Sequence, residues 1–397
     1  MKIRSLVVTS LGHFINDGNG QVLPILYAFL VSHLSVPSFM IGIFAAIYYG
    51  ISALLSPIIV RLVTSKPKVG IGMGIILWGI GLFLLGYSVE LSSIPLIIMS
   101  VIVCGISSTF YHPLGSQILY SVFRGNAGVA MGINGSLGSL GRTLYPTISL
   151  LLFTVLGFMP ITLWLIALIS VFASMVIFLV PLDERSLYST NNKASKKDQD
   201  PPDPIKVPIV AIVLLAIIGF LRSAFQRSVM QFLPSFLLLD YGYHYNVLLG
   251  LMVTVTYAGS IIGQPLMGLL SDRIGRRTTL AISGVGSIIM FLLFIKLPSP
   301  IFLFFFGLFT FTGFPLLLST AGDLVPRRSV GFANSLVWGV GVTGGGAIGP
   351  LITGILSQFI GIGRALLIMI AFAVASLALI AKLPKPKKQS KTPLFGE

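Results

Sequence analysis

Charged residues are scarce in this sequence. Only 9% of the 397 residues are Asp, Glu, Lys or Arg, whereas 55% are hydrophobic and the mean hydropathy is +0.97. A soluble domain carries about 25% charged residues, and a soluble chain this apolar would expose large apolar patches to water. This composition excludes an ordinary soluble protein and indicates a chain whose solvent is lipid.

Cysteine and histidine are also scarce, with one cysteine and four histidines. The single Cys104 excludes an internal disulfide and a cysteine-ligated metal cluster. The histidines show no metal-ligand spacing; they are His13, His33, His112 and His244. We also find no nucleophile beside a base, so we predict neither an enzyme nor a metal or other cofactor.

Long apolar segments, by contrast, are abundant. A helix needs about 20 mostly apolar residues to cross a bilayer. Twelve segments meet this criterion: 5–33, 37–63, 69–88, 93–121, 126–157, 160–181, 207–239, 246–270, 278–296, 299–324, 329–358 and 361–381. We therefore predict an all-α membrane protein with twelve transmembrane helices. Because the first segment is long and contains Asp17 and Pro24, we interpret it as a retained helix and not as a signal peptide.

One connection is much longer than the others. Residues 182–206 are charged and contain several prolines, which is typical of a flexible linker. This linker would separate an N-terminal six-helix half, 1–181, from a C-terminal six-helix half, 207–382. The basic tail, 383–397, is expected to be disordered in the cytoplasm.

Basic residues are concentrated in every second connection and at both ends of the chain. Cytoplasmic loops of membrane proteins carry the excess of Lys and Arg, so most of the 26 basic residues are placed on one side if both termini are cytoplasmic. The net charge of +15 is thus a topology signal rather than a sign of nucleic-acid binding. Attraction to anionic lipid headgroups is a side effect.

The two halves resemble each other in sequence. Residues 13–24 align with residues 223–234, and both segments end in Gln-x-Leu-Pro. Further matches in the same order are Tyr49 with Tyr257, Pro57 with Pro265, Pro113 with Pro315, and Pro146 with Pro350. Many secondary transporters are built from such repeats, with the substrate site at the repeat interface near the bilayer midplane.

The connection between the eighth and ninth segments carries the most specific motif. Residues 268–277 read Gly-Leu-Leu-Ser-Asp-Arg-Ile-Gly-Arg-Arg. This run resembles the signature G-x-x-x-D-[RK]-x-G-[RK]-[RK] of the major facilitator superfamily at every position, although its first-half counterpart is degenerate. The resemblance implies the major facilitator fold, two pseudo-symmetric six-helix halves. It also implies a gating role for Gly268, Asp272, Arg273, Gly275, Arg276 and Arg277.

Within that superfamily the chain resembles the fosmidomycin-resistance exporters. The resemblance rests on Gly12-His13-x-x-Asn16-Asp17, on Phe110-Tyr111-His112-Pro113 and on an intramembrane Arg222. It implies a proton-driven exporter and leaves the substrate open.

Asp17 is the one carboxylate placed well inside a predicted transmembrane helix. An ionised side chain at that depth costs about 2.5–3.5 kcal/mol or more unless it is paired or wetted. Helical spacing puts Asp17 on one face with His13, Asn16 and Gln21. The seventh segment repeats this stripe with Gln226, Arg227 and Gln231, and the fifth places Arg142 and Tyr145 at similar depth.

We hypothesise that Asp17, assisted by His13, carries a coupled proton. Burial favours the neutral carboxyl and a nearby arginine favours the charged one, so alternating access could switch between the two. Arg142 and Arg227 would alternately hold Asp17 and an anionic group of the substrate. The predicted substrate-binding residues are Asn16, Gln21, Tyr111, His112, Arg142, Tyr145, Arg222, Gln226, Arg227 and Gln231.

Each of these roles has an alternative. The charges could form a fixed structural salt bridge, and His112 could make a helix-packing hydrogen bond. Arg222 lies one residue off the Arg227 stripe, so it faces the cavity, reaches toward the interface or pairs across the bundle. Asp272 and Arg276 are interpreted as conformational contacts rather than substrate ligands.

The functional prediction is a monomeric secondary transporter of the plasma membrane. Its partners would be a small molecule, protons and the lipid bilayer, not nucleic acid. Proton-coupled efflux of a drug or metabolite follows from the resemblance, and proton-linked import of an organic anion is the alternative. A membrane enzyme or a channel fits less well, because paired charges between two similar halves favour an occluding gate.

Overall fold

The computed structural model of this chain describes residues 2–63, 65–123, 127–182, 208–325 and 330–384. Helices dominate these ranges, and no strand occurs within them. The first six helices are α1 (Lys2–His33), α2 (Phe39–Val63), α3 (Pro67–Glu90), α4 (Ile94–Phe123), α5 (Ala127–Leu156) and α6 (Met159–Leu179).

The C-terminal helices follow after the undescribed residues 183–207. They are α8 (Ile209–Tyr241), α9 (Val247–Ile274), α10 (Arg276–Lys296), α11 (Pro300–Thr310), α12 (Gly313–Leu324), α13 (Val330–Ser335), the π-helix η3 (Leu336–Thr343), α14 (Gly344–Ile360) and α15 (Ile362–Ile380). The predicted linker and tail fall almost wholly outside the described residues, so the domain limits stay a prediction.

The prediction of twelve transmembrane helices is confirmed. Within the described residues, 11 helical stretches are long and apolar enough to span a membrane, with α11–α12 forming one and the run through α14 another. The remaining crossing is α1, whose polar residues lower its hydropathy but whose 32 residues exceed the length a bilayer requires.

Local sequence explains where several helices begin and end. Pro67 and Pro300 stand in the first turns of α3 and α11, where a missing backbone N–H costs nothing. Gly242 ends α8 with φ of 71°, a left-handed conformation that favours glycine. The Asn246 side chain caps α9 by accepting a hydrogen bond of 3.0 Å from the Leu248 backbone N–H.

Two predicted helices are interrupted. The tenth segment breaks at Phe311 and Thr312, where the hydroxyl of Thr312 donates to the Phe309 carbonyl at 2.7 Å and Arg222 donates to the same oxygen at 3.2 Å. In the eleventh segment, the glycine-rich residues 336–343 form a π-helix. Glycine is a poor helix former, and a side chain on Gly341 would press on the α8 backbone.

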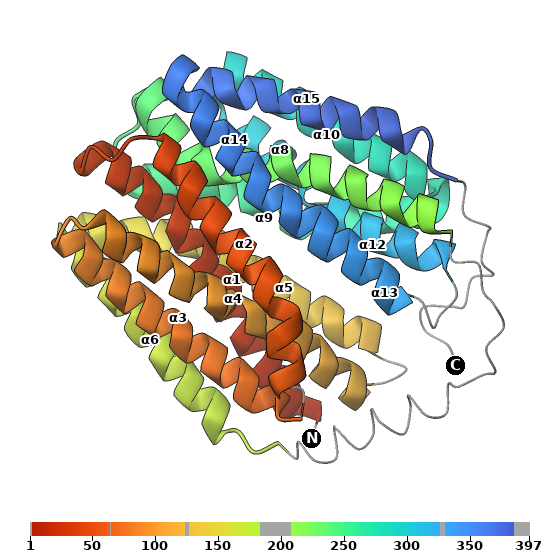
Figure 1. The fold of residues 1–397 in the computed structure, drawn as a ribbon, viewed down its shortest axis with the longest axis horizontal. Helices are drawn as coiled ribbons and strands as arrows, with labels where there is room; N and C mark the ends of the chain where they lie inside the picture. The colour runs from red at the N-terminus through yellow and green to blue at the C-terminus, as the bar shows by residue number, and fades with distance from the viewer. Residues whose placement is uncertain (1, 64, 124–126, 183–207, 326–329, 385–397) are drawn as a thin grey trace.

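The helices form two six-helix groups, coloured red to yellow-green and green to blue in Figure 1. The most extensive contacts between the halves are those of α2 with α14 and of α5 with α9, and α1 also packs on α8. Glycines permit this close approach, since a Cβ on Gly42 would overlap the Pro350 carbonyl and one on Gly250 would press on Pro146.

The halves contact each other on the side where α1 ends. There Ser38 and Ser357 lie 3.1 Å apart, and the Tyr245 hydroxyl donates to the Ile25 carbonyl at 2.8 Å. Toward the marked N-terminus, α2 diverges from α14 and α13 (Figure 1), and the α2 side chains Leu54 and Leu62 are 75% and 71% exposed. The molecule is therefore closed at one membrane face and splayed at the other.

Candidate functional site

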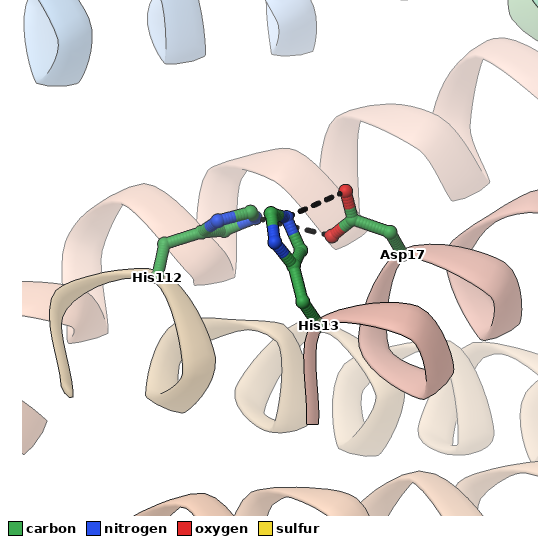
Figure 2. Close-up of side chains that lie close together, drawn as sticks. All are labelled: His13, Asp17 and His112. Atoms are coloured by element: carbon green, nitrogen blue, oxygen red, sulfur yellow. Dashed lines mark ion pairs between the residues drawn. The ribbon is translucent and has the colours of Figure 1, made fainter. Parts of the chain in front are cut away.

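Asp17 is the centre of a buried charge cluster in the N-terminal half. Its side chain is 5% exposed. Arg142 Nη1 lies 2.8 Å from one carboxylate oxygen, and His13 Nε2 lies 3.2 Å from the same atom. His112 Nε2 lies 3.4 Å from the other oxygen. Figure 2 shows the two imidazoles approaching the carboxylate from one side.

Three helices deliver these groups. His13 and Asp17 stand one turn apart on α1 and so share a face. His112 comes from α4 and Arg142 from α5. The close packing of α1 on α5 depends on glycine, because a Cβ on Gly138 would overlap the His13 ring.

Neighbouring side chains orient the carboxylate. The Asn16 amide donates to Asp17 at 3.0 Å, and the buried Trp78 indole N–H donates to the Asn16 oxygen at 3.0 Å. Arg142 also donates to the Ser139 hydroxyl at 2.9 Å. Asp17 is thus held on both oxygens, as a buried carboxylate requires.

Asn134 determines which nitrogen of His13 carries a proton. His13 Nδ1 lies 2.9 Å from the Asn134 backbone carbonyl and 2.9 Å from its side-chain oxygen, which also accepts from Tyr111 at 2.7 Å. A carbonyl only accepts hydrogen bonds, so Nδ1 is the donor. A neutral His13 would then turn the Nε2 lone pair toward Asp17. The 3.2 Å contact is favourable when a proton lies on one of these two atoms.

The same three residues also meet a geometric criterion for a metal site. One ligand atom from each of His13, Asp17 and His112 lies within 4.8 Å of the others. The spacing of histidines in the sequence did not predict this group, because His112 stands on a different helix. A metal cation would meet the Arg142 guanidinium already bound to Asp17. We therefore interpret the group as an ion-pair site.

Arg227 lies apart from this cluster, on α8. Its Nη1 donates to the Tyr49 hydroxyl at 3.1 Å, and its guanidinium lies 4.9 Å from the centre of the Tyr49 ring. Gln231 donates to the same hydroxyl at 3.0 Å. Among the described residues no carboxylate lies within ion-pair distance of Arg227. Asp17 is therefore paired with Arg142. The sequence analysis had left open whether Arg142 or Arg227 is its partner.

Two tyrosine–glutamine contacts cross between the halves. Tyr49 of α2 accepts from Gln231 of α8, and Tyr257 of α9 donates to Gln21 of α1 at 2.5 Å. The sequence repeat pairs Tyr49 with Tyr257 and Gln21 with Gln231. The two contacts are therefore pseudo-symmetric equivalents, and each tyrosine reaches the glutamine of the opposite half.

Three other predicted substrate residues make no ion pair or hydrogen bond with Asp17 or Arg227 in the described part of the chain. Arg222 is buried in the C-terminal half, where it donates to the Ser283 hydroxyl at 2.9 Å and to the Phe309 carbonyl. The amide of Gln226 is buried and has no hydrogen-bond partner in the described part of the chain. Tyr145 is buried, and its ring packs edge-on against Phe14.

The signature motif forms a small ion-pair network at the ends of α9, α10 and α12. Arg276 contacts Asp272 at 2.8 Å and Asp323 at 3.0 Å. Gly275 links α9 to α10 with φ of 94°, which a residue with a side chain rarely adopts. Arg277 donates to the Leu383 carbonyl at 3.3 Å. Gly268 has open space around it, and Arg273 is exposed.

The sequence analysis missed three contributors to the site. Asn134 shares a helix face with Gly138 and Arg142, so four-residue spacing on α5 could have identified it. Tyr49 is matched with Tyr257 in the sequence repeat, which could have identified it, whereas Trp78 carries no comparable signal because its partner lies on another helix.

Comparison with known proteins agrees with this architecture. A family model described as Major Facilitator Superfamily matches residues 9–249 and residues 215–397. The chain is 24% identical over 362 residues to the fosmidomycin resistance protein of Escherichia coli (strain K12), covering 88% of this chain and 85% of that protein. It is 25% identical over 360 residues to the uncharacterized transporter YfnC of Bacillus subtilis (strain 168), covering 87% and 86%.

Solved structures show the same fold. A bacterial homolog of the human lysosomal transporter Spinster superposes with a TM-score of 0.76 at 12% identity, covering 95% of this chain and 96% of that one. The nucleoside transporter NupG superposes with a TM-score of 0.70 at 16% identity, covering 96% and 98%. This chain belongs to the Major Facilitator Superfamily and is a multi-pass membrane transporter, not an enzyme.

Proposed function

We propose that the protein is a proton-coupled exporter of a small molecule, a drug or metabolite, that works by alternating access. The observation that carries the proposal is the contact of His13 with Asp17 midway along α1, which is favourable when it holds a proton. Export is supported by the name of the Escherichia coli relative, a resistance protein. The distribution of Lys and Arg supports placing both termini in the cytoplasm.

The groups facing Asp17 set its affinity for protons. The positive or ionisable partners within ion-pair distance are His13, His112 and Arg142. Hydroxyls that interact with it electrostatically belong to Tyr48, Tyr111 and Tyr257. When the proton leaves, Asp17 keeps Arg142 as its partner, and the attraction between His13 and Asp17 is lost. Such a change at the α1–α5 contact could favour one conformation over the other.

Proton-linked import of an organic anion is the second candidate. It is favoured by Arg227, a cation without a carboxylate partner among the described residues. Counterflow in liposomes under imposed pH gradients of either sign would separate the two directions.

The substitution Asp17→Asn tests the proton role. Asparagine fills the same space and cannot take up the proton, so we expect accumulation driven by a pH gradient to fall at least about tenfold. A thermal-shift screen of organic anions, phosphonates and cationic drugs would first identify a substrate, and its uptake into proteoliposomes would be measured. Exchange of labelled for unlabelled substrate without a gradient is the control, and it should persist. Full pH-driven accumulation by the variant would show that Asp17 only holds α1, α4 and α5 together within the N-terminal half.

A further inference from the structure

The two charge centres of the molecule differ in how they are neutralised. Asp17 has Arg142 and two imidazoles around it. Arg227, its equivalent in the sequence repeat, has the Tyr49 hydroxyl and ring as its direct partners, and the Tyr48 and Tyr257 phenols interact with it electrostatically. A guanidinium in the interior of a membrane protein is costly unless an anion or water compensates its charge. No carboxylate among the described residues neutralises Arg227, so an anion is the partner that this guanidinium lacks.

The atoms around Arg227 already form half of an anion site. Arg227 and Gln231 stand one turn apart on α8, and both donate to a single oxygen, the Tyr49 hydroxyl, at 3.1 and 3.0 Å. Two donors that converge on one acceptor are the arrangement that a carboxylate or phosphonate oxygen satisfies better than a neutral phenol, because charge-assisted hydrogen bonds are stronger. The Tyr49 hydroxyl occupies the place of that anionic oxygen.

We infer that Arg227 and Gln231 bind the acidic group of an organic-anion substrate, and that this group displaces the Tyr49 hydroxyl. The inference rests on the proposed transport function and adds the substrate class, a small organic acid carrying a carboxylate or phosphonate. Binding of the substrate would also remove one contact between the two halves. Tyr49 is one of the two equivalent tyrosines that join the halves, so displacing it leaves Tyr257–Gln21 as the remaining tyrosine–glutamine contact.

Direct binding tests the inference without transport. Purified protein in detergent would be titrated with benzoate and phenylphosphonate, with benzamide as the neutral analogue and benzylamine as the cation, and the thermal midpoint would be followed. We expect the two acids to raise the midpoint and the neutral and cationic compounds to leave it unchanged. No response to either acid, or an equal response to benzamide, would overturn the proposal.

Three substitutions separate the roles of the residues. Arg227→Gln should weaken acid binding by at least about tenfold, and Arg227→Lys, which keeps the charge, should retain part of it. Tyr49→Phe removes the competing hydroxyl and keeps the aromatic face, so acids should bind about threefold or more tightly. An unchanged affinity in Arg227→Gln, or a weaker one in Tyr49→Phe, would contradict the displacement.

Tyr245→Phe is the matched control. It removes another hydrogen bond between the halves, Tyr245 to the Ile25 carbonyl, without touching Arg227. Acid affinity should stay at the wild-type value, and an increase equal to that of Tyr49→Phe would mean that general loosening, not competition, is responsible. Asp17→Asn should still bind acids. Full pH-driven transport by Asp17→Asn would contradict the proton role alone, and absence of acid binding to the unmodified protein would contradict the acid site alone, so the two failures are distinguishable.

Discussion

At the scale of single residues, the site depends on how buried charges find partners. Asp17 is paired with Arg142 and not with its repeat equivalent Arg227. Arg222, which the sequence leaves facing the cavity, the interface or a partner across the bundle, donates to Ser283 and to a backbone carbonyl at the break between α11 and α12. Its role as a substrate ligand remains a prediction, and these contacts suit a residue that fixes the break.

A pair of glycine substitutions tests the placement of His13. Gly138→Ala would put a methyl group into the His13 ring, whereas Gly135, one turn earlier on α5, has open space around it. We expect Gly138→Ala to displace His13 from Asp17 and to reduce pH-driven transport about tenfold or more. Gly135→Ala should transport like the wild type, as measured in the same proteoliposomes. Equal activity of the two variants would show that the His13–Asp17 contact is not needed.

At the scale of helices, the signature motif connects three helix ends of the C-terminal half. Arg276 holds Asp272 on α9 and Asp323 on α12 together. Both carboxylates are partly exposed, and exposed ion pairs contribute only about 0–1 kcal/mol each. A contact of that strength suits a conformational switch, since it can form and break during each transport cycle.

The substitution Asp272→Asn tests this role. Arg276 would keep Asp323 and lose one partner, so we expect turnover to slow by a factor of about 3–10. Ligand binding, measured by thermal shift, should not change, because the ion-pair partners of Arg276 are Asp272 and Asp323 and do not include Asp17 or any residue that contacts Arg227. Asp240→Asn is a matched control, as that carboxylate, in the last turn of α8, accepts from the Gly363 backbone N–H in the first turn of α15. Unchanged turnover in Asp272→Asn would count against gating.

At the scale of the whole molecule, the two halves are closed on one side and splayed on the other. Polar contacts at Ser38–Ser357 and Tyr245–Ile25 hold the closed side. Mid-depth contacts, Tyr49 with Arg227 and Tyr257 with Gln21, lie between that closure and the splayed ends. Alternating access requires that the closed side open in another step of the cycle.

A disulfide across the closed side tests whether it opens. The Ser38 and Ser357 hydroxyl oxygens lie 3.1 Å apart, so cysteines at these positions are close enough to be oxidised to a disulfide. In a background with the native Cys104 replaced by alanine, oxidation of Ser38→Cys/Ser357→Cys should lower transport at least about tenfold, and a reductant should restore it. Each single cysteine variant should be insensitive to oxidation. Full transport by the crosslinked protein would mean that this side does not open.

The sequence by itself determined the number of crossings, their limits to within a few residues, and the pseudo-symmetry of the halves. It could do so because length, hydropathy and helical spacing are local properties, set by the bilayer thickness and by the periodicity of the α-helix. The sequence also placed His13, Asn16 and Asp17 on one helix face, because that placement depends only on helical spacing. Asn134, one turn from Gly138 on α5, could have been found in the same way.

The tertiary structure alone decided which groups meet. Asp17 pairs with Arg142 and not with Arg227, and His112 of α4 contacts the same carboxylate. Tyr49 and Tyr257 each contact a residue of the opposite half. These partners lie on helices distant in sequence, and their contact depends on the rotation and close approach of packed helices, which glycines such as Gly138 permit. Helical periodicity places a side chain on a face of its own helix, but only packing decides what that face meets.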